Sequence, residues 1–242
     1  ISACLVGSEM CIRDRRNRAA PAQRFPPPKP PKKTAKVVFD APERESEEPR
    51  TFRLGVVPGA TPGKWIDAWK QRMPHVPLEL VPVEVADQRA ALDDLDAALV
   101  RLPLTDETLH VITLYDEVPV VVASIDSHLL AADELTIADL AGEIVMVPTD
   151  DPLGPIDIPG ALAPTFAPLT VAEAIPTAAA GTGIVILPMS LARVHHRKDV
   201  RHRLLVDGPT STVALVWRRD HTTPDVETFI GIVRGRTSNS SR

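Results

Sequence analysis

The sequence is poor in aromatic residues, contains no long apolar run and has no excess of positive charge. Aromatic residues make up 4% of the 242 residues, so a core must be built from Ala, Val, Leu and Ile, as in largely parallel α/β sheets. No apolar run approaches the roughly 18–20 residues that cross a bilayer. The formal net charge of −5 argues against nucleic-acid binding by the chain as a whole. A globular protein outside the membrane is therefore expected.

Cysteine is confined to the first fifteen residues, at Cys4 and Cys11. The segment GSEMCIRDR within residues 1–15 resembles a translated sequencing adaptor, and a signal peptide is the alternative interpretation of the apolar Ile1–Gly7. No basic residue precedes that run and charged residues follow at once, so we interpret residues 1–15 as an adaptor artefact. The rest of the chain then has no cysteine, which excludes disulfides, thiol catalysis and cysteine metal sites.

Residues 16–50 have the composition of a tail or linker. They hold 8 of the 25 prolines, and Arg16–Lys36 carries seven positive charges and no negative one before an acidic stretch begins. So few apolar residues favour a disordered, polyproline-like segment, with weak and non-specific nucleic-acid contact as the alternative. A helix-turn-helix does not fit there, because PPPKPP cannot lie in a continuous helix. Without residues 1–50, the chain has 16 basic and 25 acidic residues and a net charge of −9.

From Phe52 onward, short apolar runs alternate with helical patterns. Strands are expected at residues 52–58, 78–83, 95–103, 109–124 (with a bend at 115–117), 144–148 and 184–187. Helices are expected from Pro62 and Gly63 to Met73, with Thr61 as the N-cap, and at residues 87–92, 135–143, 173–180 and 189–195. This alternation predicts an α/β protein with two lobes.

Several motifs give this alternation a family resemblance. The run AAGTGIVILPMSLA, followed some twenty residues later by VALVWRRD, resembles the effector-binding domain of LysR-type transcriptional regulators. Asp96–Ala97 fits the family's strand pattern, and Glu117, His128 and Leu129 fit the run at which the family's chain enters its second lobe. The stretches GATPGKW, SLARVHHRKD and FIGIVRGRTSNSSR are similar to an actinobacterial group of such domains that generally lacks the helix-turn-helix.

The resemblance implies a type 2 periplasmic-binding-protein fold with mixed sheets and an interlobe cleft over residues 51–242. Lobe I is expected at about 51–114 and 220–242, and lobe II at about 115–219. Such domains bind a small-molecule effector and catalyse nothing, so we expect a cytoplasmic sensor without a cofactor or specific DNA binding of its own. A truncated LysR-type regulator and an extracytoplasmic solute-binding protein are the alternatives. The sequence leaves open whether the chain forms a homodimer.

Enzymatic and metal-binding interpretations lack the necessary patterns. Adjacent His195 and His196 would point to different faces of a helix, and His202 follows in what we interpret as a solvated basic helix end. Ser190 is not in the G-x-S-x-G turn of a nucleophilic serine. We therefore expect neither a catalytic nor a metal site.

The expected ligand site follows from the fold, because open α/β sheets bind ligands beyond the carboxyl ends of their strands. Amides at the start of a helix and the guanidinium of Arg101 would suit a carboxylate. An interlobe salt bridge is the alternative role of Arg101, and Asp150 and Asp151 would repel an anion. The predicted ligand-binding residues are Gly59, Ala60, Thr61, Arg101, Leu102, Pro148 and Thr149.

Overall fold

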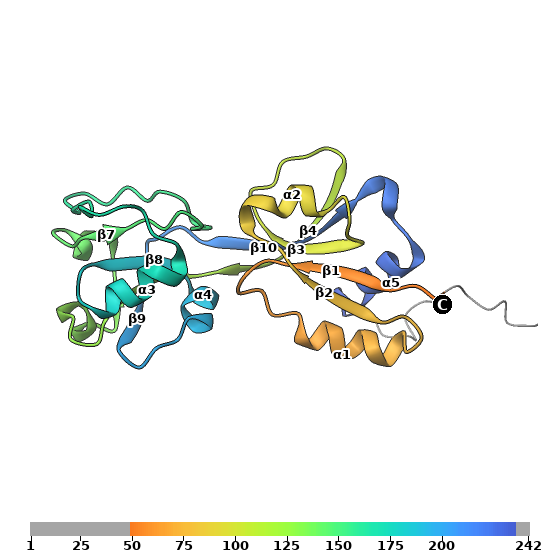
Figure 1. The fold of residues 1–242 in the computed structure, drawn as a ribbon, viewed down its shortest axis with the longest axis horizontal. Helices are drawn as coiled ribbons and strands as arrows, with labels where there is room; N and C mark the ends of the chain where they lie inside the picture. Colours follow the sequence, from red (N-terminus) through yellow and green to blue (C-terminus); the bar gives the residue numbers. More distant parts are fainter. Residues whose placement is uncertain (1–48, 236–242) are drawn as a thin grey trace, which may run out of the picture. The chain divides into compact units, whose positions relative to one another are not determined.

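The computed structural model describes residues 49–235, which belong to one compact unit of the chain (Figure 1). The expectations for residues 1–15 and for most of the 16–50 tail lie outside the described residues. Within residues 49–235, no helix combines the length and apolar content needed to cross a bilayer.

A mixed five-stranded sheet forms the first lobe. Residues Ala97–Val100 in its centre are almost fully inaccessible, which explains the unbroken apolar run of this strand. The first three strands in the order below are parallel, and β10 runs antiparallel to both of its neighbours. The order is β2 (Leu78–Pro82), β1 (Phe52–Val56), β3 (Ala97–Arg101), β10 (Ser211–Arg218) and β4 (Leu109–Glu117).

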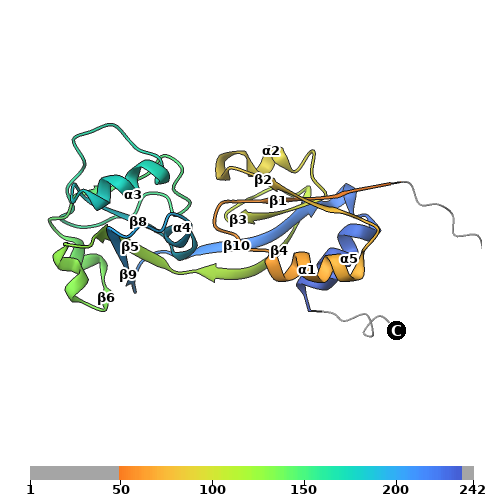
Figure 2. The ribbon, with the colours of Figure 1, turned by 60° about the horizontal axis from the view of Figure 1, so that its bottom comes forward.

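Helices α1 (Gly63–Arg72) and α5 (Pro224–Val233) cover one face of this sheet, and the short α2 (Gln88–Ala91) lies on the other face (Figure 2). The rings of Phe52, Trp69 and Phe229 pack together beneath α1 and α5, with centroids 4.6–5.9 Å apart. The Trp69 indole donates a 2.8 Å hydrogen bond to the Val76 carbonyl, so this tryptophan belongs to the core.

A second mixed sheet forms the second lobe. Helices α3 (Val171–Ala179) and α4 (Met189–Val194) bury Val171, Ile175 and Leu191 against one of its faces. The sheet order is β6 (Glu134–Leu135), β9 (Val200–Leu205), β5 (Pro119–Ser124), β8 (Ile184–Pro188) and β7 (Val145–Met146). Short 3₁₀ turns complete the described elements at Val85–Asp87, His128–Ala131, Ile137–Leu140 and Arg219–His221.

Two chain segments connect the lobes. Strand β4 leads through Val118 into β5, and residues 206–210 lead from β9 back to β10 (Figure 2). Ser211–Arg218 pairs with β3 and β4, so the chain re-enters the first sheet at Ser211. The expected start of this return at residue 220 was therefore too late, because the continuous apolar run did not reveal which sheet β10 joins.

Three local predictions differ from the structure. Val200–Leu205 is a strand with β5 and β6 as neighbours, so His202 lies in a sheet and not at a helix end. The helix expected at residues 135–143 is reduced to strand β6 and a 3₁₀ turn. Helix α1 has Pro62 and not Thr61 as its N-cap, and no side chain caps it. In each case tertiary pairing or local backbone geometry overrode the sequence pattern.

Candidate functional site

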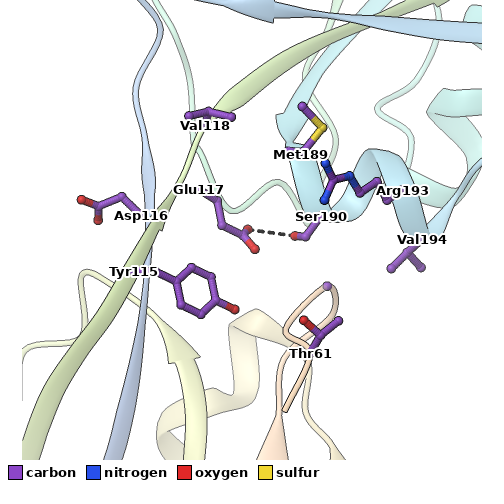
Figure 3. Close-up of a pocket in the computed structure, with 10 residues that line it drawn as sticks. Thr61, Tyr115, Asp116, Glu117, Val118, Met189, Ser190, Arg193 and Val194 are labelled. Carbon is purple, nitrogen blue, oxygen red and sulfur yellow. Dashed lines mark hydrogen bonds between the residues drawn. The ribbon is translucent and has the colours of Figure 1, made fainter. Parts of the chain in front are cut away.

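A cavity of about 480 Å³ lies where the two lobes meet, within the 300–1,000 Å³ that ligand pockets usually occupy (Figure 3). The first lobe contributes the loop after β1 and the end of β4, and the second lobe contributes the first turns of α4. A molecule bound here would contact both lobes at once. The lining residues are Gly59, Thr61, Tyr115, Asp116, Glu117, Val118, Met189, Ser190, Arg193 and Val194.

Gly59 permits the close approach of the lobes at the edge of the cavity. Its φ of +86° is in the left-handed region, which L side chains rarely adopt. A Cβ atom at this position would lie 2.4 Å from the Ser190 hydroxyl oxygen and 3.1 Å from Nη2 of Arg101. Both the backbone conformation and the packing therefore require glycine here.

A buried hydrogen-bond network joins the lobes next to the cavity. Arg101 donates from Nη1 to Glu117 Oε2 at 2.6 Å and to Ser211 Oγ at 2.8 Å. From Nη2 it donates to the Pro58 carbonyl at 3.1 Å and to Ser190 Oγ at 3.2 Å. The Ser190 hydroxyl in turn donates to Glu117 Oε2 at 2.8 Å. Ser190 is the second-lobe member of this network, which we call the interlobe latch.

The Arg101 side chain is 1% exposed and the Glu117 side chain 8% exposed. Two charges at this depth are retained only when they are paired and hydrogen-bonded, and here they compensate each other. Nε of Arg101 is buried without a partner among the described residues. The salt bridge of Arg101 therefore lies within the first lobe, and its contact with the second lobe is the hydrogen bond to Ser190, not the interlobe salt bridge that was the alternative prediction.

Tyr115 and Thr61 line the first-lobe side of the cavity. Burial raises the pKa of the Tyr115 phenol, and the neighbouring Glu117 carboxylate raises it further, whereas the Arg101 charge and the backbone N–H of Thr61 lower it. The hydroxyl therefore keeps its proton and can donate it to a ligand.

The loop that contains Asp150 and Asp151 lies within electrostatic reach of the latch. Burial raises the pKa of Asp151 to about 6, although the Leu153 N–H donates a 2.9 Å hydrogen bond to its carboxylate. The Asp150 charge raises this pKa as well, while the Arg101 charge lowers it. Asp150 accepts a 2.7 Å hydrogen bond from Val171 N–H at the start of α3.

Only two of the seven predicted ligand residues line the cavity. Gly59 and Thr61 line the cavity, and Arg101 lies behind its wall in the latch. Ala60 packs against the α1 and α5 core, and Leu102 packs on the α2 side of the sheet. Pro148 and Thr149 are outside the lining, and Thr149 N–H bonds to the Leu169 carbonyl.

Other lining residues were missed as ligand candidates. Tyr115 and Arg193 reach the cavity only because β4 and α4 meet there, which no local pattern indicates. Glu117 was recognised only as part of a family motif, which does not indicate that its side chain lines a cavity. Ser190 was considered only as a nucleophile. No group of three or more potential metal-ligating side chains occurs within residues 49–235.

Comparisons with known proteins agree with this architecture. The LysR substrate binding domain family model matches residues 45–238. The Hca operon transcriptional activator HcaR of Escherichia coli (strain K12) is 26% identical over 213 residues, covering 80% of this chain and 70% of the activator.

Solved structures show the same fold. The BenM effector binding domain with its effector benzoate has a TM-score of 0.63 at 20% identity, over 78% of this chain and 95% of that one. The reduced OxyR regulatory domain from Pseudomonas aeruginosa has a TM-score of 0.58 at 20% identity, over 78% of this chain and 96% of that one. The predicted two-lobed, type 2 periplasmic-binding-protein-like fold is confirmed.

Proposed function

Because the chain belongs to the family of LysR substrate-binding domains, we propose that it binds a small-molecule effector in the interlobe cavity. The observation that carries this proposal is that both lobes line one cavity. The matched relative is a transcriptional activator, so a regulatory sensor is the role that agrees with the homology. We place this role in the cytoplasm, where a regulator of transcription meets metabolites.

The latch offers a route from binding to a conformational signal. Ser190 lines the cavity and also bonds to Arg101 and Glu117. A ligand that contacts the first turn of α4 differently in two arrangements of the lobes would shift the balance between them. We assign Arg101 to this framework and not to the ligand, because both of its Nη atoms already have partners.

Catalysis is not part of the proposal. The Ser190 hydroxyl is bonded to a guanidinium and a carboxylate, whereas a nucleophilic serine needs a base that accepts its proton during attack. The Oε2 atom of Glu117 is shared between the Arg101 guanidinium and the Ser190 hydroxyl, which holds both side chains in the latch.

The test is a ligand screen with a matched pair of cavity variants. Val194 is 60% exposed and lines the cavity, whereas Val206 is 51% exposed and lies outside the lining. Val194→Trp should block the cavity, and Val206→Trp adds the same bulk elsewhere. Metabolites are screened by thermal shift, since a ligand at a hundred times its Kd stabilises the protein by about 2.7 kcal/mol.

We expect hits to stabilise the parent protein and Val206→Trp but not Val194→Trp. Hits that stabilise all three proteins equally would place the ligand outside the cavity. A broad screen without any compound that distinguishes the two tryptophan variants would contradict effector binding at this site.

A further inference from the structure

The cavity contains one cation whose charge is not compensated. Within residues 49–235, the side chain of Arg193 makes no hydrogen bond or ion pair, although Arg193 lines the cavity from the second turn of α4. Its side chain extends back over Met189 and Ser190, as side chains on a helix point toward the N-terminus (Figure 3). The guanidinium therefore presents its donors to the cavity.

The acidic residues of the cavity do not neutralise Arg193. Glu117 is engaged with Arg101 and Ser190 in the latch. Asp116 accepts a 2.6 Å hydrogen bond from the Thr212 hydroxyl and points away from Tyr115 and Arg193 (Figure 3).

The positive charge of Arg193 also acts on its surroundings in the second lobe. Burial lowers the pKa of His202, and Arg193 lowers it further, as do Arg203 and His196. Arg193 thus adds a positive charge to the second-lobe wall of the cavity, which an anionic group would compensate.

The opposite wall supplies a neutral donor. The Tyr115 hydroxyl faces the cavity together with Thr61, and its raised pKa keeps its proton available for donation (Figure 3). Val118, Met189 and Val194 give the cavity an apolar surface beside these polar groups. A guanidinium, a phenol and an apolar surface together suit a molecule with one carboxylate and a hydrocarbon body.

We propose that Arg193 selects the charge of the effector by pairing with a carboxylate, while Val118, Met189 and Val194 contact its apolar body. This assignment rests on the proposed function of the cavity. It replaces Arg101 by Arg193 as the cation that recognises the ligand.

The experiment compares acids with primary amides of the same shape. Isothermal titration of the full chain uses benzoate and benzamide, cyclohexanecarboxylate and its amide, and hexanoate and hexanamide. Arg193→Gln removes the charge and keeps polar atoms. Lys198→Gln is the matched control, because it removes one positive charge from the same exposed segment outside the cavity lining.

We expect at least one acid to bind the parent about tenfold or more tightly than its amide. Arg193→Gln should abolish that preference and leave the affinity for the amide unchanged, whereas Lys198→Gln should keep the preference. An acid that binds Arg193→Gln as tightly as the parent would overturn the assignment, as would the absence of any preference for acids. Both of those results leave the proposed function intact, since it fails only if no ligand distinguishes Val194→Trp from Val206→Trp.

Discussion

Single residues decide how closely the two lobes can meet. Arg101, Glu117 and Ser190 form a buried group in which each polar atom depends on the others. Removal of one charge from such a pair leaves the other buried and uncompensated, which typically costs about 3–5 kcal/mol. The latch favours this lobe contact, because another lobe arrangement would remove the hydrogen bonds of Ser190 to Arg101 and Glu117, whereas the Arg101–Glu117 pair lies within the first lobe.

Gly59 should be intolerant of a side chain for two separable reasons. Gly154 has a similar φ of +70°, and no atom lies within 4 Å of the place that a Cβ atom would take there, so Gly154→Ala measures the backbone cost alone, about 1–2 kcal/mol. Gly59→Ala should cost at least about 1 kcal/mol more, because its Cβ would collide with Ser190. Urea unfolding followed by circular dichroism compares the two variants, and equal losses would contradict the tight contact.

Asp151 should make the stability of the protein depend on pH. Burial raises its pKa from 3.8 to about 6, so the folded state binds this proton more tightly than the unfolded chain. The resulting stabilisation is complete below about pH 4 and is lost as the pH rises through 6. Asp151→Asn avoids that loss and can still accept the Leu153 hydrogen bond. Above pH 6 we expect the free energy of unfolding of Asp151→Asn to exceed that of the parent by about 1–2 kcal/mol. This is less than the full pKa shift implies, because the carboxyl is partly solvated.

The measurement is the free energy of urea unfolding between pH 4 and 8. Asp157→Asn, an exposed position in the same loop, controls for the loss of one negative charge. A constant difference between Asp151→Asn and the parent across this range would contradict the prediction.

At the scale of elements, α3 shows how a short helix is fixed in the second lobe. It has nine residues, too few for stability in isolation, so capping and packing must define it. The Thr170 hydroxyl and backbone N–H both bond to Glu173 at 2.9 Å, and Asp150 accepts from Val171 N–H. These contacts place the start of α3 beside the Asp150–Asp151 loop.

Loss of this cap should lower stability. Thr170→Ala should cost about 1 kcal/mol, because it removes the hydroxyl of the capping box. Thr177→Ala in the same helix is the control, since its hydroxyl bonds to the Glu173 carbonyl within the helix and alanine favours helix there. Chemical denaturation measures both, and a Thr177→Ala loss as large as that of Thr170→Ala would contradict a specific role of the cap.

At the scale of the whole molecule, two chain segments hold the lobes together. Arg50 pairs with Asp225 at the start of α5 at 2.6 Å, which ties the beginning of the described chain to the first lobe. Strands β4 and β10 pair with each other over their full length in the first sheet. The chain leaves for the second lobe at the end of β4 and returns from it at the start of β10. The lobes should therefore resist separation by proteases.

Limited trypsin digestion should leave one resistant fragment that begins near Thr51. The basic, proline-rich composition of residues 16–50 supplies many cleavage sites and few apolar residues to protect them. Intact-mass measurement of the fragments gives the boundary. Protection that extends back to Arg24 would contradict this organisation. A parallel digest with subtilisin, which unlike trypsin can cleave at Val118 and at residues 206–210, should show no early cut there that frees the lobes.

The sequence by itself determined the elements with strong local patterns. The α/β class followed from two kinds of pattern: the largely apolar strands β1, β3 and β8, and the helical spacing of Trp65 and Trp69 on α1 with Met73 at its C-cap. Burial of a strand or of one helical face leaves such a pattern in the sequence. The order of motifs from Asp96 to the β10 run gave the family. Strand β9 was not predicted, because its consecutive basic residues Arg201–Arg203 suggest a solvated surface, whereas β5 and β6 pair with it on either side.

Only the tertiary structure decided which residues meet in the cavity. Gly59 and Thr61 could be predicted because the end of a strand is visible in the sequence. Tyr115 and Arg193 are far apart along the chain, and their meeting depends on how the lobes are set by the latch. The packing of the first sheet decided that Arg101 faces Glu117, since an arginine at a strand end suits a ligand or an ion pair equally well until its surroundings are known.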